Sequence, residues 1–510
     1  MKEFPIPVVL GKGQKPDSRF RLASSGFSET VKNFRPTGDG YEYNHALSHT
    51  ITGATTTVSW PYPQLFKGEE TGTTVLALST ALYTLNVSTW VATAVSTKDP
   101  ADFLSSKAIS SGGPWQFVSF QEYYYLTNGT TSVVSMPGQG GVALSVTDQT
   151  VQAVGRHGTR LLVGGLGGTY YTDSNSYFNS YIVPAWRRRA SDEVVTHDSQ
   201  TFDTNWIVWT APSGGDLDLP WGTLVQQLAY PSHANVVKIR DTVLYQFENG
   251  ILGMMPLKGG TVRTIQDYGN FVLVGTDRFI VRLDPTDTGY RESVLWPVGV
   301  KGRGWVTEGL IVDSNGILLE VSNGALQKVG YETELSALSS SIGTIVTNPT
   351  EGEFYIADGT TSYVYNEHGL AQSTNFITSL YEQNIGIASN PSNRNDFDWV
   401  SLPFDLNFNG QKTLNFVELR GFGLSSLVMY VYYRNDRTSS FTASSAIYGS
   451  PDGAFWAGQT GIEFKIRFTG TIASGGKLEE IIVRANYHDN RTVRGPRGTG
   501  LGALQSSSDS

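Results

Sequence analysis

The chain has 510 residues, 39% of them hydrophobic and 12% aromatic, so it is long enough to bury more than one core. Its formal net charge of −9 argues against a general nucleic-acid binder, because such binding depends on neutralising phosphates with Lys and Arg. It contains no cysteine, which excludes disulfides, cysteine-ligated zinc and a thiol nucleophile.

The chain begins MKEFPIPVVLGKGQK, which lacks the continuous apolar stretch of a secretory signal. No later stretch approaches the roughly 18 to 20 apolar residues of a membrane span. We therefore expect a protein that is made in the cytoplasm and does not insert into a membrane. Residues 1–60 show little periodicity and are predicted to form an N-terminal arm and the first strands.

Short runs of alternating apolar residues recur over residues 61–390, each broken by a turn such as Asn-Gly, Asp-Gly or Gly-Gly, and this pattern predicts β-hairpins. The predicted hairpins cover 74–85, 123–135, 159–172, 243–255, 271–283, 316–329 and 353–365. Their spacing of roughly 30 to 50 residues is typical of radial repeats. With a further strand and loop at 205–221, we predict an irregular β-propeller of about seven blades. A meandering array of sandwiches without closure is the alternative.

From residue 396 the predicted strands are longer and alternate more regularly. They cover 399–408, 414–423, 427–436, 462–470 and 478–488. In IEFKIRFTG (462–470), Phe464, Ile466 and Phe468 fall on one face, and Lys465 and Arg467 on the other, as in a half-buried strand. The sequence thus predicts an all-β fold in which a β-sandwich over 396–490 follows the propeller, with 389–397 as the connecting loop. The Gly- and Ser-rich residues 491–510 are predicted to be a flexible tail.

Several motifs resemble ligand sites but lack the required context. GKGQK (11–15) and VGGLGG (163–168) are interpreted as turns, because neither has P-loop spacing or a strand–helix setting. His45 and His49 are interpreted as a chance pair, because no Glu follows His45 and no helix is indicated. The segment 450–456, SPDGAFW, departs from the sialidase Asp-box because Gly453 directly follows Asp452.

The acidic turns TDSNS (172–176) and VDSNG (312–316) resemble the first half of a calcium loop but lack its distal Glu, and we interpret them as Asx turns. The sequons at Asn86, Asn128 and Asn490 are interpreted as chance matches. We therefore predict no catalytic, cofactor or metal site and no enzymatic activity. A glycosidase with paired carboxylates leaves no sequence signature and stays open.

Arg187, Arg188 and Arg189 form the densest basic cluster of this acidic chain. Consecutive strand residues point alternately, so the three cannot converge on one small ligand. They are the candidate contact with DNA or with a neighbouring subunit. The alternative is a solvated loop anchored by Trp186.

In the order of its parts the chain resembles the propeller-bearing tail hub and nozzle proteins of short-tailed bacteriophages, including the packaged-DNA stabilisation proteins. The resemblance rests on the irregular hairpins, the embedded segment NWIVWTAPSGGDLDLPW (205–221), the closing β-sandwich (399–488) and the apolar, Pro-containing start EFPIPVVLG (3–11).

The resemblance implies a structural virion protein of the tail. Such a protein forms a ring, here a homohexamer, that contacts the tail adaptor and the fibre or spike proteins, continues the DNA channel and seals the genome. DNA would pass through the lumen without sequence-specific binding, since an acidic wall repels it. The alternatives are a carbohydrate-binding or glycan-cleaving propeller and a receptor-binding tail fibre protein.

Overall fold

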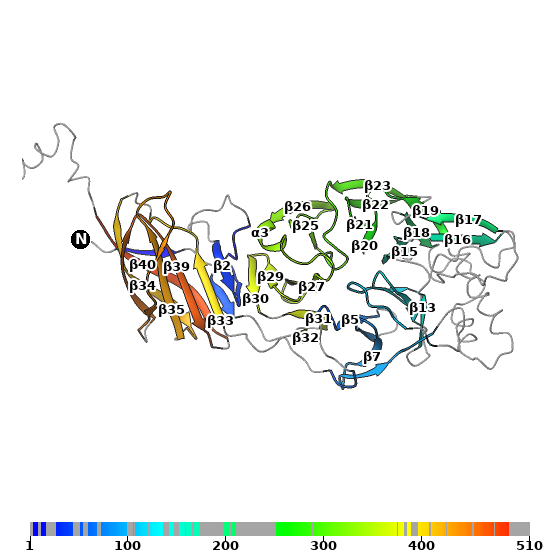
Figure 1. Ribbon diagram of the computed structural model, residues 1–510, viewed down its shortest axis with the longest axis horizontal. Helices are drawn as coiled ribbons and strands as arrows, with labels where there is room; N and C mark the ends of the chain where they lie inside the picture. The colour runs from blue at the N-terminus through cyan, green and yellow to red at the C-terminus, as the bar shows by residue number, and fades with distance from the viewer. Residues whose placement is uncertain are drawn as a thin grey trace, which may run out of the picture.

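The computed structural model describes residues 4–8, 12–16, 27–43, 51–54, 60–68, 73–98, 106, 108–120, 123–135, 142–146, 152–158, 160–165, 168–173, 197–202, 206–210, 251–286, 289–374, 376–381, 385–388, 396–406, 410–424, 426–450, 453–473 and 475–488 (Figure 1). Within these ranges nearly all of the regular secondary structure is β-strand. The described part contains one short helix, α3 (Glu332–Leu335). The predicted nearly all-β character is therefore confirmed.

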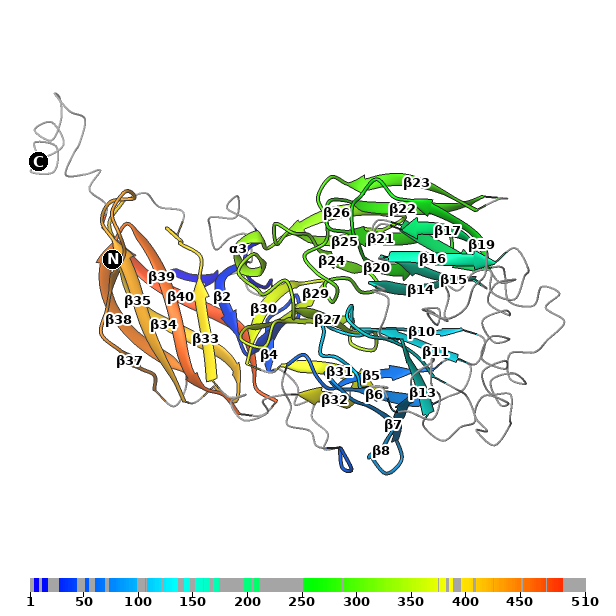
Figure 2. The same cartoon turned by 45° about the vertical axis from the view of Figure 1, so that its right-hand side comes forward.

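Small antiparallel sheets follow one another along the middle of the chain (Figure 2). The first sheet contains β5 (Gln64–Lys67), β6 (Thr74–Ala77), β7 (Leu82–Asn86) and β8 (Val91–Ala94). The second contains β10 (Gln116–Phe120), β11 (Tyr123–Thr127), β12 (Ser132–Ser135) and β13 (Val142–Val146), with β9 (Ser96–Lys98) parallel to β13. The third contains β14 (Ala153–His157), β15 (Arg160–Gly164), β18 (Trp206–Thr210) and β19 (Ile251–Pro256).

The series continues with three further sheets of two to four strands and with four strands at one end of a ten-stranded sheet, which we number as the sixth sheet. The fourth sheet contains β20 (Val262–Asp267), β21 (Val272–Thr276), β22 (Ile280–Thr286) and β23 (Gly289–Trp296). The fifth contains β24 (Leu310–Val312), β25 (Leu318–Ser322) and β26 (Ala325–Gly330). The sixth is formed by β27 (Thr344–Asn348), β28 (Glu353–Ala357), β29 (Ser362–Asn366) and β30 (Gly369–Ser373), and the seventh by β31 (Ile377–Tyr381) and β32 (Ile385–Ala388). A separate hairpin joins β16 (Gly168–Asp173) to β17 (His197–Phe202).

Apolar side chains fill the space between neighbouring sheets of this series, which we call the sheet array. Val75 and Trp115 belong to one core between the first and second sheets. Similar cores join the third sheet to the fourth, the fourth to the fifth and the fifth to the sixth. The seventh sheet also contacts the first, where the Leu65 N–H donates to Ser379 Oγ at 2.7 Å.

Arg303 is a buried residue where sheets distant in sequence meet. Its guanidinium donates to the carbonyl oxygens of Thr127, at 2.8 Å, and Pro114, at 3.4 Å. Burial, and to a smaller extent the nearby Arg263, lower the pKa of Arg303 to about 9. Because that value still exceeds 7, the chain keeps a buried positive charge that is solvated by backbone carbonyls.

The C-terminal strands form two sheets that face each other across one core, and we call them the two-sheet unit. One sheet has the order β3 (Phe34–Pro36), β4 (Tyr41–Tyr43), β40 (Lys477–Tyr487), β34 (Lys412–Phe422) and β38 (Ala454–Gly461), and β1 (Phe4–Val8) also pairs with β40. The other includes β2 (Ser28–Lys32), β33 (Asp396–Ser401), β39 (Glu463–Thr471), β35 (Ser426–Arg434), β36 (Thr442–Ala443) and β37 (Ile447–Tyr448). Phe464, Ile466 and Phe468 are fully buried in the core between them, as the alternation predicts.

Five predicted hairpins are confirmed by antiparallel pairing: β6–β7, β11–β12, β21–β22, β25–β26 and β28–β29. In the β25–β26 hairpin Asn323 and Gly324 have φ values of 51° and 77°, the left-handed pair that a two-residue hairpin turn requires. The hairpin predicted over 159–172 is wrong, because β15 pairs with β14 and β18, and β16 pairs with β17. Local turn residues cannot report that a strand prefers a distant partner. Most of the hairpin predicted at 243–255 lies outside the described residues.

Candidate functional site

The predicted contact residues Arg187, Arg188 and Arg189 lie outside the described residues, as do His45 and His49. Their roles therefore stay predictions. The described part of the chain offers a different candidate site, at the junction between the sheet array and the two-sheet unit.

An N-terminal segment joins the two units by backbone hydrogen bonds. The N–H of Gln14 donates to the carbonyl of Leu370 at 2.6 Å, and the N–H of Lys15 donates to the carbonyl of Ser28 at 3.0 Å. Next to it, β2 pairs with β30 on one side and β33 on the other. Figure 1 shows β2 between the two units. One ten-stranded sheet therefore runs from the sheet array into the two-sheet unit.

This arrangement corrects the interpretation of GKGQK (11–15) as a turn. None of its described residues, 12–15, belongs to a turn, and Gln14 forms bridges to both Ser28 and Leu370. A Cβ on Gly13 would lie 2.3 Å from the carbonyl oxygen of Leu370. Gly13 therefore permits close approach of two backbones, which the sequence pattern does not separate from a turn.

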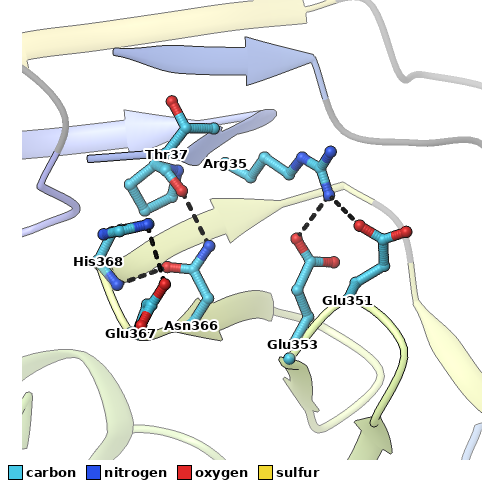
Figure 3. Close-up of a pocket in the computed structure, with 9 residues that line it drawn as sticks. Arg35, Thr37, Glu351, Glu353, Asn366, Glu367 and His368 are labelled. Carbon is cyan, nitrogen blue, oxygen red and sulfur yellow. Dashed lines mark hydrogen bonds and ion pairs between the residues drawn. The ribbon is translucent and has the colours of Figure 1, made fainter. Parts of the chain in front are cut away.

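A pocket of about 380 Å³ opens beside this junction, and we call it the junction pocket (Figure 3). Arg35 and Thr37 reach it from the N-terminal strands, whereas Glu351, Glu353, Asn366 and His368 come from the sixth sheet. Residues more than 300 positions apart in the chain thus share one small polar site.

Arg35 is the centre of an ion-pair network in this pocket. Its Nη1 lies 3.0 Å from Glu353 Oε1 and 3.2 Å from Glu351 Oε2, and its Nη2 lies 3.2 Å from Glu42 Oε2. Burial by itself lowers the pKa of Arg35, but the attraction of Glu353 and the hydrogen bonds to all three carboxylates outweigh it, so the pKa is raised. Arg35 therefore stays charged and fixes both units to one another.

Glu353 is the most buried member of the network, with 5% of its side chain exposed. Its Oε2 accepts a hydrogen bond of 2.9 Å from the hydroxyl of Tyr355. Burial, followed by the nearby Glu353 carboxylate, raises the pKa of Tyr355 well above its usual range. The phenol thus remains a donor that holds Glu353 towards Arg35.

The opposite side of the junction pocket is held by an amide and a turn. Asn366 Nδ2 donates to the carbonyl of Pro36 at 2.9 Å, and its Oδ1 accepts from the N–H groups of His368 and Gly369. His368 Nε2 lies 3.4 Å from a carboxylate oxygen of Glu367. The bond from Asn366 to Pro36 again links the N-terminal strands to the sixth sheet, and the other contacts fix the turn that carries Asn366.

The charged residues of the junction pocket form ion pairs that hold the two units together. Three carboxylates already share the guanidinium of Arg35, so none of them is presented as a separate acid or base. Within the ranges that the structure describes, no group of three or more His, Asp or Glu side chains is arranged to hold a metal ion. No helix of the described part is long and apolar enough to cross a membrane.

Two other motifs can be placed in the described residues. In VDSNG (312–316), Asp313 Oδ1 accepts from the N–H groups of Asn315 and Ile317, both at 2.9 Å, which confirms the Asx turn. Asn128 is 1% exposed, and its Oδ1 accepts from the N–H groups of Thr130 and Thr131. That sequon is a buried turn residue.

Sequence reasoning did not identify Arg35, Glu351 or Glu353 as site residues. Each is a single charged residue in a short strand or turn, and no local motif surrounds it. They form a site only because the fold brings them together as ion pairs across the junction.

Comparisons with known proteins identify no family. No family model matches the chain, and no curated protein matches it. Among solved structures, the extracellular domain of a one-component system from B. thetaiotaomicron has a TM-score of 0.36 at 10% identity, covering 89% of this chain. This chain spans 62% of that domain.

Two further solved structures have similar scores. The WD40 domain of Neurospora crassa Pan2 has a TM-score of 0.33 at 8% identity, covering 70% of this chain and 92% of the domain. A protein described as a 6-phosphogluconolactonase from Bacteroides uniformis has a TM-score of 0.29 at 13% identity. The match covers 61% of this chain and 93% of the chain of that protein. At TM-scores below 0.5 these likenesses assign neither a family nor an activity.

Proposed function

We propose that this chain is a structural component of a bacteriophage tail, a nozzle or hub protein that forms a homohexameric ring and continues the DNA channel. The observation that carries the proposal is the continuous ten-stranded sheet through β30, β2 and β33, together with the Arg35 network beside it. A spacer between rings must transmit force without bending between its parts. A hydrogen-bonded sheet across the junction supplies that stiffness.

In this proposal the sheet array is an irregular β-propeller. Six sheets and four strands at one end of the ten-stranded sheet follow one another in the described residues, and the last sheet contacts the first. Radial packing of this kind protects sheet edges because each sheet covers its neighbour. The two-sheet unit is correspondingly a β-sandwich, and the N-terminal strands belong to it through β1–β40 and β2–β33 pairing.

The role assigned to the ring follows from charge and geometry. A net charge of −9 makes attachment to passing DNA unfavourable, because nonspecific affinity grows with the number of phosphates neutralised. The genome would therefore slide through the lumen without sequence-specific binding. Adaptor and fibre or spike proteins are the partners of the two ring faces, and the virion tail is the site of action.

The oligomeric state of the purified protein and its presence in virions test this proposal. We expect sedimentation velocity and negative-stain images to show closed hexameric rings, and mass spectrometry of purified virions to find the chain in tails. Monomers at every concentration, together with absence from virions, would reject the tail role. If glycan arrays show binding to a sugar by such monomers, the carbohydrate-binding alternative replaces it.

A further inference from the structure

A second pocket, of about 560 Å³, lies on the outer face of the two-sheet unit beside the junction segment, and we call it the cationic pocket. Its lining contains four cationic side chains and two carboxylates, a local formal charge of +2 in a chain whose total is −9. The charged residues are Lys15, Arg434, Arg437, Lys465, Glu29 and Glu463.

Three cations of this region have a carboxylate partner. Arg434 pairs with Glu463, Lys465 with Glu29 at 2.5 Å, and Arg437 with Asp405 at 2.6 Å. Lys15 lies within ion-pair distance of no carboxylate in the part of the chain that the structure describes. The acidic group that it influences is Glu334, whose pKa is raised by burial and lowered in part by the attraction of Lys15. The excess positive charge of the lining therefore has its clearest source at Lys15, on the segment that joins the two units.

The pocket also offers apolar surface. The ring of Phe441 lies near two cations, with Arg434 Cζ at 4.5 Å and Lys465 Nζ at 4.9 Å from its centroid. These contacts hold the ring in place without covering all of it, since Phe441 remains partly exposed. Pro403 adds a partly exposed apolar side chain to the pocket, and Leu402 is buried behind it.

We propose that the cationic pocket binds an acidic peptide segment in which an apolar side chain neighbours a carboxylate. The carboxylate would lie by Lys15, and the apolar side chain would pack on Phe441 and Pro403. Charge complementarity favours an acidic partner, because a single carboxylate neutralises part of the excess charge. A phosphate backbone carries several adjacent charges, whereas Lys15 is the one lining cation without an ion pair to the described residues, so we expect nucleic acid to bind more weakly.

Binding can be measured on the isolated full-length protein, so the test of this inference does not depend on the tail role. The probe is a fluorescein-labelled peptide of alternating Asp and Phe, compared by fluorescence anisotropy with the same peptide carrying Asn for Asp. Labelled oligothymidine of similar length is the nucleic-acid probe. We expect the acidic peptide to bind, and both other probes to bind at least about tenfold more weakly.

Charge reversal then locates the site. Lys15→Glu should raise the Kd for the acidic peptide at least about tenfold, and Lys15→Met should raise it less. Lys258→Glu makes the same change at an exposed lysine of the sheet array and should leave the Kd within about twofold. Thermal unfolding of each variant checks the fold, and Lys15→Met serves if Lys15→Glu is unfolded. Unchanged affinity in the folded Lys15 variants, or tighter binding of oligothymidine, would overturn the proposal.

Discussion

The guanidinium of Arg35 lies 3.0 Å from the carboxylate of Glu353, although 318 positions separate the two residues in the chain. One residue belongs to a strand of the two-sheet unit and the other to the sixth sheet of the sheet array. Both side chains are largely buried, with 13% and 5% exposed. The pair therefore reports directly on whether the two units are docked.

Removing one member of this pair should be costly. Arg35→Met leaves the buried carboxylate of Glu353 without its cation and should lower the free energy of unfolding by about 3 kcal/mol. The double variant Arg35→Met, Glu353→Gln should recover part of the loss. Urea denaturation measures both. The matched control is Arg420→Met, whose loss of an exposed pair with Glu480 should cost far less than the loss of Arg35. Equal losses in the two single variants would contradict a special role for Arg35.

Lys412 should make stability depend on alkaline pH. It is fully buried, its Nζ donates to the carbonyl of Gly410 at 3.1 Å, and burial lowers its pKa to about 8. The pKa in the unfolded chain is about 10.4, so between these values the unfolded state binds more protons. Stability from this group is therefore smallest below pH 8 and rises as the pH increases towards 10. The difference in unfolding free energy between wild type and Lys412→Met, followed from pH 7 to 10, should show that rise. A difference that stays constant would show that Lys412 does not titrate in this range.

Asp313 should be a structural residue with no need of calcium. It is fully buried, and its Oδ2 also accepts from the Trp296 indole at 3.0 Å. Asp313→Ala should cost about 2 kcal/mol, because three donors lose their acceptor. Asp313→Asn keeps an acceptor oxygen and should cost less. Calcium should not shift the Tm of the wild type, and a clear upward shift would revive the calcium-loop interpretation.

Trp456 should participate in contacts between copies of the chain. It is 72% exposed on β38, which is the last strand of its sheet in the described part and carries no charged residue. Open strand edges without charges associate readily. Trp456→Ser should reduce the oligomeric fraction in sedimentation velocity at unchanged Tm. Val294→Ser, at a residue 48% exposed in the sheet array, is the control. An oligomer distribution identical to that of the wild type would exclude Trp456 from the interface.

The Arg187, Arg188 and Arg189 cluster gives a prediction that rests on the sequence alone. Replacing all three with Ser should impair particle assembly or genome retention if they contact DNA or a neighbouring ring. Complementation of a phage that lacks the gene, followed by particle counts and packaged DNA content, measures the effect. Normal particles with normal DNA content would leave the cluster as a solvated loop.

Local sequence pattern indicated many of the strands of this protein, and five of the seven predicted hairpins are confirmed. The alternation of Phe464, Lys465 and Ile466 fixes which face of β39 is buried, because successive side chains point to opposite sides of a strand. Asn323 and Gly324 fix a hairpin turn, because both positions need a positive φ. These properties depend on residues that are neighbours in the chain, so they can be predicted from the sequence.

Pairing between distant segments was decided only in the tertiary structure. Nothing near Gly13 shows that it lies against Leu370, and nothing near Arg35 shows that it faces Glu353. The wrong prediction at 159–172 has the same cause, because β15 pairs with the distant strand β18 and not with the strand that follows it. Sheet partners and ion pairs depend on which surfaces meet after the chain has folded back on itself. That is why the junction and its two pockets became visible only in three dimensions.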